Sequence, residues 1–240
     1  MHMPDGYLGP NTYLPFWIIM IPIWFYAGRW LRTNLRTKQV PYLALAAAFS
    51  FVIMMFNVPI PGGSTGHAVG SALVAIILGP WAAVVTTSVA LLIQCLLFGD
   101  GGITTFGANC FNMAVVIPFV GFYTYKFIAG KTKITDRRRI VGAGVGGWLG
   151  LTVAAACAGF EMGIQPIINV SSTGVPLYMP YPLSVTVPAM VIGHAFFFSI
   201  VEVIVTVLAF TYIARNDPTI IWNYKAIEAA SRPRVPAAAA

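Results

Sequence analysis

The composition of this chain excludes a water-soluble globular protein. Of its 240 residues, 58% are hydrophobic and only 9% are charged, whereas soluble domains carry about 25% charged residues. In a soluble chain, a net charge of +7 would suggest a nucleic-acid partner. In a membrane protein, the positions of the basic residues indicate the topology instead. Three cysteines without a CxxC pair provide neither a disulfide framework nor a thiolate metal site.

Long apolar blocks, separated by Pro, Gly and short polar clusters, predict an all-α bundle of about seven transmembrane helices. Each block approaches the about 20 residues that a helix needs to cross the hydrocarbon core. In chain order the blocks cover residues 13–30, 42–56, 67–78, 81–98, 104–127, 140–160 and 182–213. We expect residues 1–220 to form a single membrane domain. Residues 221–240 are expected to be a cytoplasmic tail that is mobile or was added to the native protein.

All fourteen Lys and Arg residues fall in three segments, and this predicts the topology. They are Arg29, Arg32, Arg36 and Lys38, then Lys126, Lys131, Lys133, Arg137, Arg138 and Arg139, then Arg215, Lys225, Arg232 and Arg234. Basic residues collect in cytoplasmic loops. We therefore expect the N-terminus outside, the C-terminus inside, and a multi-pass protein in the inner or plasma membrane of a prokaryote.

The first two residues have the chemistry of a metal chelate. The start MHMPDGYLGPNT lacks the basic region and apolar core of a cleavable signal peptide. Because His2 is too large to favour removal of the initiator, we expect a free amine on Met1. That amine, the deprotonated amide of His2 and its imidazole can bind one ion in a plane. Ni(II) and Cu(II) favour this tetragonal nitrogen geometry, which suits zinc poorly.

A second imidazole is needed as the fourth donor, and the chain has two candidates. His67 lies in PGGSTGHAVGSAL at the outer start of the third block, where glycines allow close approach of the backbone. His194 lies well inside the seventh block, so His67 is the better partner. Taken alone, the residues still favour simpler interpretations, an exposed His2 and a helix-capping His67.

Three segments closely resemble the CbiM/NikM family, the substrate-binding membrane subunits of nickel and cobalt energy-coupling-factor transporters. They are MHMPDGYLGP, GSTGHAVGSALVAIILGPWAAV and LLFGDGGITTFGANCFNMAVVIPFVG. The resemblance is strong over the first five predicted helices and diffuse beyond them. It implies that Met1 and His2 supply the amine, amide and imidazole nitrogens and that His67 completes a planar site.

The resemblance also implies a function and partners. It implies high-affinity capture and import of nickel or cobalt as the substrate, with no resident cofactor. Nickel is favoured because a planar field of four nitrogens suits Ni(II), whereas Co(II) more often takes axial ligands. The implied partners are an energy-coupling transmembrane subunit, two ATP-binding-cassette ATPases and, as an optional member, a small accessory membrane subunit.

Further residues near the predicted site admit more than one interpretation. Asp5 could accept a hydrogen bond from an imidazole N–H, although a simple turn-forming role is favoured. Asn109 and Asn112 lie three residues apart on one helix face at the outer start of the fifth block. They could bond to His67, line the pocket, or form a packing network between helices.

Two pairs of residues lie further from the predicted site. His194 and Glu202 lie eight residues apart in the seventh block and are roughly co-facial. Ionisable residues in a membrane are functional candidates, but a structural or partner-facing role is favoured. The small residues Ala44 and Ala48 near the cytoplasmic end of the second block indicate either internal packing or docking of the coupling subunit.

The chain carries no GxxxxGK[ST], HExxH or GxSxG motif, and we predict that it is not an enzyme. ATP hydrolysis would then come from a separate chain. The alternative function is a stand-alone, proton-coupled permease for divalent metals. Such a permease would need both His194 and Glu202, and no ATPase.

Overall fold

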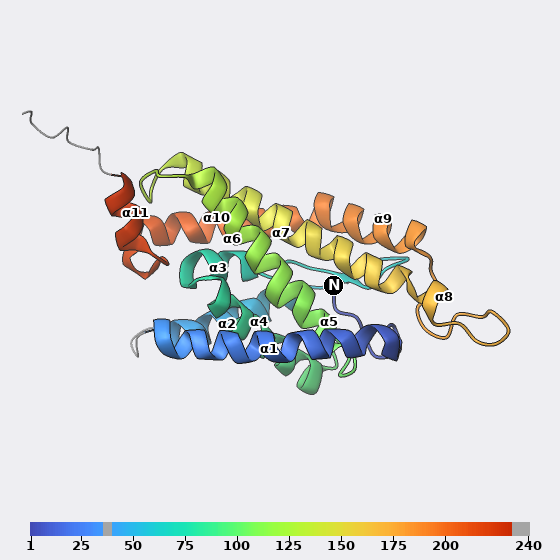
Figure 1. Ribbon diagram of the computed structural model, residues 1–240. Helices are drawn as coiled ribbons and strands as arrows, with labels where there is room; N and C mark the ends of the chain where they lie inside the picture. Colours follow the sequence, from blue (N-terminus) through green and yellow to red (C-terminus); the bar gives the residue numbers. More distant parts are fainter. Residues whose placement is uncertain (36–39, 232–240) are drawn as a thin grey trace, which may run out of the picture.

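The computed structural model describes residues 1–35 and 40–231, and helices dominate it (Figure 1). The helices are α1 Pro10–Asn34, α2 Val40–Met54, α3 Ser71–Leu78, α4 Pro80–Ile93, α5 Phe106–Cys110, α6 Ile117–Ala129, α7 Arg137–Gly163, α8 Gln165–Ile168, α9 Leu183–Gly193, α10 Ser199–Asn216 and α11 Tyr224–Ser231. The strands β1 Val58–Pro59 and β2 Thr65–Gly66 pair antiparallel, with Val58 opposite Gly66. The predicted all-α membrane fold is confirmed.

Three of the long helical segments contain a π-helical turn. Gln94–Phe98 extends α4, Phe111–Val116 joins α5 to α6, and His194–Phe198 joins α9 to α10. Such turns are rare in proteins, and those that occur often lie at functional sites. With these turns included, five helices in the described part of the chain are long and apolar enough to cross a membrane, and α2 is apolar but has only 15 residues.

The third predicted helix differs from its expected range. We predicted it over residues 67–78, but α3 begins at Ser71 and has eight residues, about 12 Å of helix. The preceding chain forms the β1–β2 hairpin and an extended stretch through His67. Irregular backbone can lie at membrane depth only where protein covers it, and His67 and Val69 are fully buried. The count of seven crossings stays a prediction.

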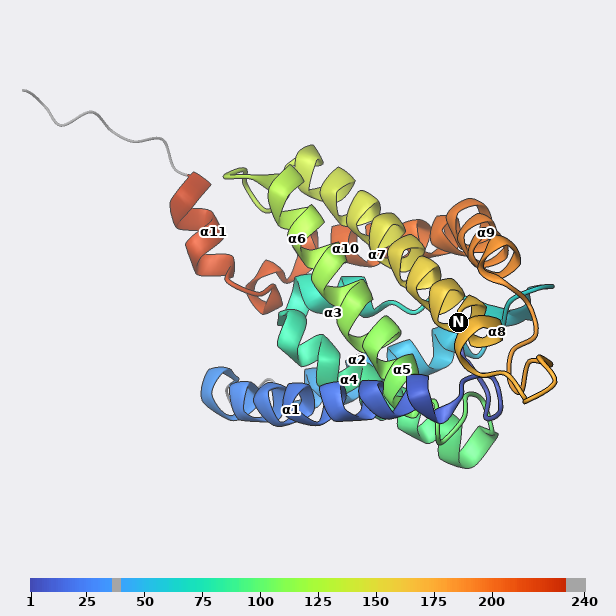
Figure 2. The ribbon, with the colours of Figure 1, turned by 45° about the vertical axis from the view of Figure 1, so that its right-hand side comes forward.

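The helices form two groups with α3 between them. In Figures 1 and 2, α1, α2 and α4 lie on one side, and α6, α7, α9 and α10 lie on the other. Glycines bring α6 and α7 into backbone contact, because a Cβ on Gly146 would lie 2.5 Å from the carbonyl oxygen of Gly121. The first residues of the chain enter between the two groups, which is where the candidate site lies.

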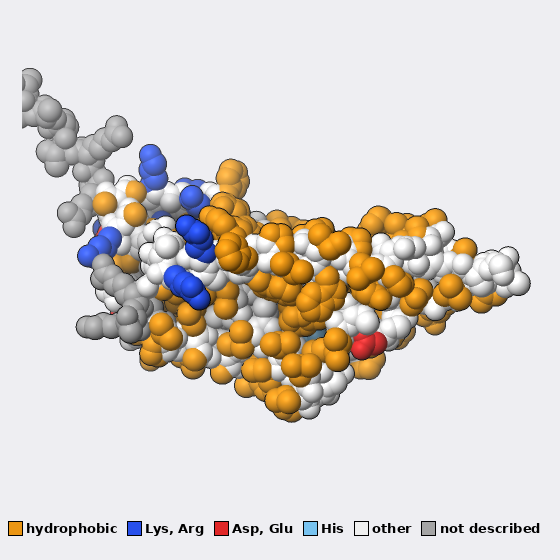
Figure 3. All heavy atoms as spheres, turned by 60° about the horizontal axis from the view of Figure 1, so that its bottom comes forward, with side chains coloured by type: hydrophobic (Ala, Val, Ile, Leu, Met, Phe, Trp, Pro, Cys, Tyr) orange, Lys and Arg blue, Asp and Glu red, His pale blue; other side chains and the backbone are white. Residues whose placement is uncertain are grey.

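The surface is that of a multi-pass membrane protein. Figure 3 shows hydrophobic side chains over the middle of the molecule and Lys and Arg side chains gathered at one end. Large apolar side chains face outward, including Phe25 and Phe127, which are 74% and 88% exposed. The basic end fits the predicted cytoplasmic face, although the orientation itself stays a prediction. Four of the basic residues on which the topology prediction depends lie outside the described residues: Arg36, Lys38, Arg232 and Arg234.

The start of the predicted tail contacts the helices at this basic end. Ile221 is buried, and the Trp222 backbone N–H donates to the Ile77 carbonyl, 2.7 Å away. Gly79, at a φ of 94°, makes the tight turn between α3 and α4, against the Trp222 ring. The boundary at residue 221 stays a prediction, and residues 232–240 lie outside the described part of the chain.

Candidate metal site

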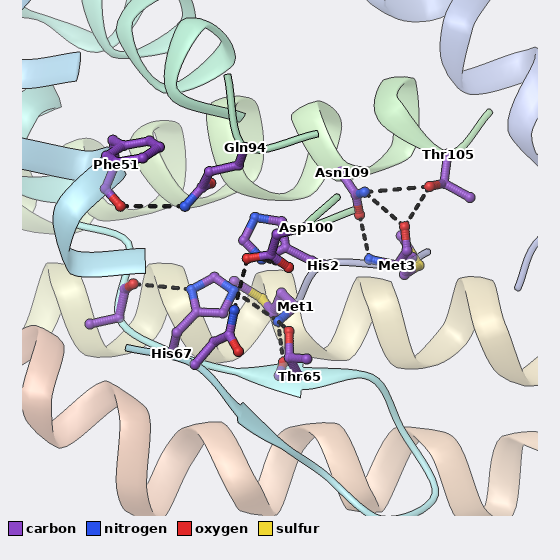
Figure 4. Close-up of polar contacts among 12 residues, drawn as sticks. Met1, His2, Met3, Phe51, Thr65, His67, Gln94, Asp100, Thr105 and Asn109 are labelled. Atoms are coloured by element: carbon purple, nitrogen blue, oxygen red, sulfur yellow. Dashed lines mark hydrogen bonds and ion pairs between the residues drawn. The ribbon is translucent and has the colours of Figure 1, made fainter. Parts of the chain in front are cut away.

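The N-terminal segment folds back into the bundle and is held there by backbone and side-chain hydrogen bonds (Figure 4). Met1 and Met3 are fully buried and His2 is 2% exposed. The side-chain amide of Asn109 bonds to both backbone polar groups of Met3. Its Oδ1 accepts from the Met3 N–H at 2.9 Å, and its Nδ2 donates to the Met3 carbonyl at 3.0 Å. The hydrogen bonds of Asn109 thus fix the N-terminal segment and do not go to His67.

Asp5 clamps the same segment to the loop before α5. Its carboxylate accepts from the N–H groups of Ile103 and Thr104, at 3.2 and 2.8 Å, and from the Thr104 hydroxyl. Partial burial raises the pKa of Asp5, but the hydrogen bonds from Thr104 and Ile103 outweigh it, and the net shift is downward. In the described structure the Asp5 carboxylate bonds to this loop, and its predicted role beside an imidazole stays a prediction.

The structure brings together the Met1 amine and the imidazoles of His2 and His67. The Met1 nitrogen lies 3.0 Å from His67 Nε2. It also donates to the carbonyl oxygen of Thr65 and contacts the Thr65 hydroxyl at 3.1 Å. The His2 ring stacks on the His67 ring with centroids 4.6 Å apart. His67 Nδ1 lies 3.1 Å from the Ala68 carbonyl, so assigning the proton to Nδ1 leaves the Nε2 lone pair facing the amine.

Burial favours the neutral forms of the Met1 amine and of His2. It lowers the pKa of the Met1 amine from 8.0 to about 4, against an opposing effect of the Asp100 charge. Burial, and then the nearby ammonium, lower the pKa of His2 to about 3, which the neighbouring Gln94 side chain partly offsets. Metal ligands must be deprotonated, and the lowered pKa values of the Met1 amine and His2 favour that state.

Two residues that were not predicted border His2. Asp100 Oδ1 lies 3.3 Å from His2 Nδ1, and Asp100 Oδ2 accepts from Asn57 Nδ2 at 2.8 Å. Burial raises the pKa of Asp100, while the ammonium and Asn57 lower it by less. Gln94 lies beside the His2 ring in Figure 4 and donates to the Phe51 carbonyl at 3.3 Å. A lone amide within the apolar run LLIQCLLF was the available signal for Gln94.

The other predicted residues lie away from these nitrogens. Asn112 Nδ2 donates to Glu161 Oε2 at 2.9 Å, so its hydrogen bond belongs to the contact with α7. Ala44 and Ala48 are both exposed on α2. Their exposure contradicts internal packing and leaves docking of another subunit as a prediction.

One face of the segment from α9 to α10 lies behind the His67 loop. Met190 Sδ lies 3.5 Å from the Ser64 backbone nitrogen, and Glu202 accepts from the N–H groups of Val69 and Gly70. His194 lies between them in the sequence, with Nδ1 2.8 Å from the Met190 carbonyl. Its Nε2 is buried without a hydrogen-bond partner in the described part of the chain. Glu202 thus contacts the backbone of the His67 loop, while the choice between a structural and a partner-facing role stays a prediction.

The donor set of this site is unusual in its use of the main chain. Among the residues that the structure describes, no group of three or more His, Cys, Asp or Glu side chains could hold a metal ion. A metal at Met1, His2 and His67 would find the two imidazoles, the Met1 amine and the His2 amide as nitrogen donors, and the amine and amide would close a five-membered ring on it. The arrangement suits an ion that displaces an amide proton.

Comparisons with known proteins identify the family of this chain. The family model for the CbiM "cobalt uptake substrate-specific transmembrane region" matches residues 2–220. A fused nickel transport protein NikMN from Rhodobacter capsulatus is 48% identical over 97% of this chain and 67% of its own length. A putative metal transport protein from Methanocaldococcus jannaschii is 45% identical over 91% of this chain and 93% of its own length.

A solved structure shares the fold as well as the sequence. The crystal structure of a truncated transition metal transporter is 43% identical to this chain and superimposes with a TM-score of 0.85. The match covers 89% of this chain and 98% of that one. The resemblance seen in the N-terminal motifs therefore extends over nearly the whole membrane domain, and the chain belongs to the CbiM family of substrate-specific transmembrane regions for cobalt uptake.

Proposed function

We propose that this chain captures Ni(II), with Co(II) as the second candidate, at the outer side of the membrane as the substrate-specific component of an ATP-driven importer. The observation that carries the proposal is the buried contact of 3.0 Å between the Met1 amine and His67 Nε2. Relatives whose names state nickel or cobalt transport support the choice of substrate. The ion is cargo and not a resident cofactor.

The distances fit a planar site. With metal–nitrogen bonds of about 2.0 Å, two neighbouring donors in a square plane lie about 2.8 Å apart, close to the observed 3.0 Å between Met1 and His67. The amine, the His2 amide and His2 Nδ1 close two fused rings on the same ion. His2 Nδ1 now lies 3.3 Å from Asp100, so it must turn from this carboxylate toward the ion.

Asp100 supplies the charge balance of the proposed site. A divalent ion brings two positive charges, and the deprotonated amide removes one. A buried charge is costly unless it is paired. Asp100 lies next to His2 and carries the one negative charge that is still required. The amide of Asn57 keeps the Asp100 carboxylate in place through its hydrogen bond of 2.8 Å.

The chain works, in this proposal, with an energy-coupling transmembrane subunit, two ATP-binding-cassette ATPases and, as an optional member, a small accessory membrane subunit. Exposed small residues let a partner helix approach closely, and Ala44 and Ala48 provide such a surface on α2. The alternative, a proton-coupled permease, requires a carboxylate that gains and loses protons during transport. Glu202 is instead committed to backbone N–H groups of the His67 loop, and no observation favours that alternative.

The test is a titration of the purified chain with Ni(II), followed by absorption spectroscopy, and a nickel uptake assay in cells. We expect one Ni(II) per chain with the spectrum of a planar four-nitrogen site, and uptake only when the coupling subunit and ATPases are co-expressed. A chain that binds no nickel or cobalt would refute metal capture. Uptake by the chain alone, sensitive to a protonophore, would support the permease instead.

A further inference from the structure

One face of the α9–α10 segment packs along residues 63–70, the part of the chain that carries His67. A Cβ on Gly63 would lie 2.7 Å from Met190 Sδ, and one on Gly66 would overlap the Phe198 ring. Further along, Glu202 bonds to the backbone at the start of α3. The contacting residues of the helical segment are spaced by multiples of four, so they lie close to one face of it. Figure 4 shows this helical ribbon running beneath the hairpin.

The lengths of the two segments agree with this parallel arrangement. From Met190 to Glu202 the helical segment rises about 18 Å over twelve residues. From Gly63 to Gly70 an extended chain spans at most about 23 Å over seven residues. The His67 loop can therefore run along the helical segment in one direction, with apolar contacts at its beginning and a polar contact at its end.

That polar contact is made by a fully buried carboxylate. Glu202 Oε2 accepts from the N–H groups of Val69 and Gly70, at 2.8 and 2.9 Å, and Oε1 lies 3.1 Å from the Gly70 nitrogen. Gly70 has a φ of 74° and immediately precedes α3, where N–H groups lack partners within the helix. No other acceptor bonds to these two N–H groups in the described chain.

His67 has few other points of attachment outside the metal site. Its Nδ1 contacts the carbonyl of the next residue, Ala68, and therefore does not tie the loop to another helix. Its Nε2 faces the Met1 amine, which is itself a proposed ligand. The hydrogen bonds two and three residues later, to Glu202, are what tie this loop to α10.

We propose that Glu202 is a positioning residue for metal capture, because it fixes the backbone after His67 and thereby sets Nε2 at bonding distance from the ion held by the N-terminus. This inference rests on the proposed function. Residues that support a metal ligand typically contribute about 10–100-fold to metal affinity.

The test compares two buried glutamates in the purified, full-length chain titrated with Ni(II). Glu202→Gln keeps the size of the side chain but removes its charge and one of its two acceptor oxygens, which weakens the bonds to Val69 and Gly70, so we expect nickel affinity to fall about 10–100-fold. The absorption spectrum should shift toward that of His67→Ala, because His67 no longer reaches the plane. Glu161→Gln is the matched control, since Glu161 is buried in α7 and bonds to Asn112 rather than to the loop. It should bind nickel as the unaltered chain does.

The outcomes separate this inference from the proposed function. If the unaltered chain binds neither nickel nor cobalt, the proposed function fails. If it binds nickel and Glu202→Gln binds equally well with the same spectrum, only the positioning role is overturned. An equal loss in both glutamine variants would also overturn it, because that result reports general destabilisation. Should Glu202→Gln not fold, Glu202→Asp keeps the charge with a shorter reach, and unchanged affinity and spectrum in that variant would refute the role.

Discussion

Adding one glycine before Met1 should abolish tight metal binding although every side chain of the site remains. The present amine lies 3.0 Å from His67 Nε2, and the new one would lie about 3.8 Å further along the chain. The old amine becomes an amide, so the fused rings on the ion are lost. Met1 is fully buried beside Thr65, which leaves no space for the added peptide unit.

The size of the effect follows from this enclosure. Burying one unpaired peptide carbonyl costs about 1–3 kcal/mol, equivalent to about 5–150-fold in affinity. The lost amine donor adds to that penalty. We therefore expect nickel to bind at least about 100-fold more weakly to the extended chain.

The assay is a nickel titration of chains that differ only at the N-terminus. Each chain carries its purification tag at the C-terminus, and mass spectrometry establishes its first residue. The matched control has the extra glycine at the C-terminus and should bind as the unaltered chain does. Nickel binding within threefold of the control, with the same spectrum, would refute the amine as a ligand and leave side chains to hold the metal.

Three other outcomes are expected. His67→Ala should lose high-affinity nickel binding while its thermal unfolding stays close to that of the parent, and a near-normal metal content in the purified variant would remove His67 from the site. Ser172→Cys should react with an impermeant thiol reagent added outside intact cells and Lys133→Cys only after the membrane is opened, since both positions are exposed; the reverse pattern would invert the topology. Gly102→Ala should weaken nickel binding, because its methyl group would lie 2.3 Å from a backbone nitrogen of the N-terminal segment, whereas Gly28→Ala has nothing within 4 Å and should bind normally. Equal affinities of the two alanine variants would show that this close approach does not hold the segment.

The helices could be predicted from hydropathy because most of them are apolar over their whole length. In the third block, however, hydropathy does not locate the start of the helix. Residues 67–70 (HAVG) contain no helix-breaking proline and no charged Lys, Arg, Asp or Glu, and a short buried run of this kind can be extended or helical without any change in composition. Only the contacts of Val69 and Gly70 with Glu202, more than 130 residues later, decide between them.

The candidate ligands could be predicted for a different reason. Met1 and His2 are adjacent, so their chelate geometry follows from covalent structure alone, and the family resemblance supplied His67. Asp100 could not be assigned to His2 in the same way, because their contact joins segments almost a hundred residues apart. Sequence periodicity places a side chain on a face of its own helix, but it does not identify the residue opposite.

Because of the π-helical turn His194–Phe198, the contacts of the α9–α10 segment depend on the number of residues between Met190 and Glu202. Deleting one residue there would leave a regular α-helix with unchanged hydropathy, yet it would rotate α9 relative to α10 by about 100°. Met190 would turn away from Ser64 while Glu202 kept its hold on Gly70. In homologous sequences, the amino acids at positions 191–201 should therefore vary far more readily than the number of residues in this segment. An insertion or deletion within 191–201 would indicate a different geometry of the His67 loop.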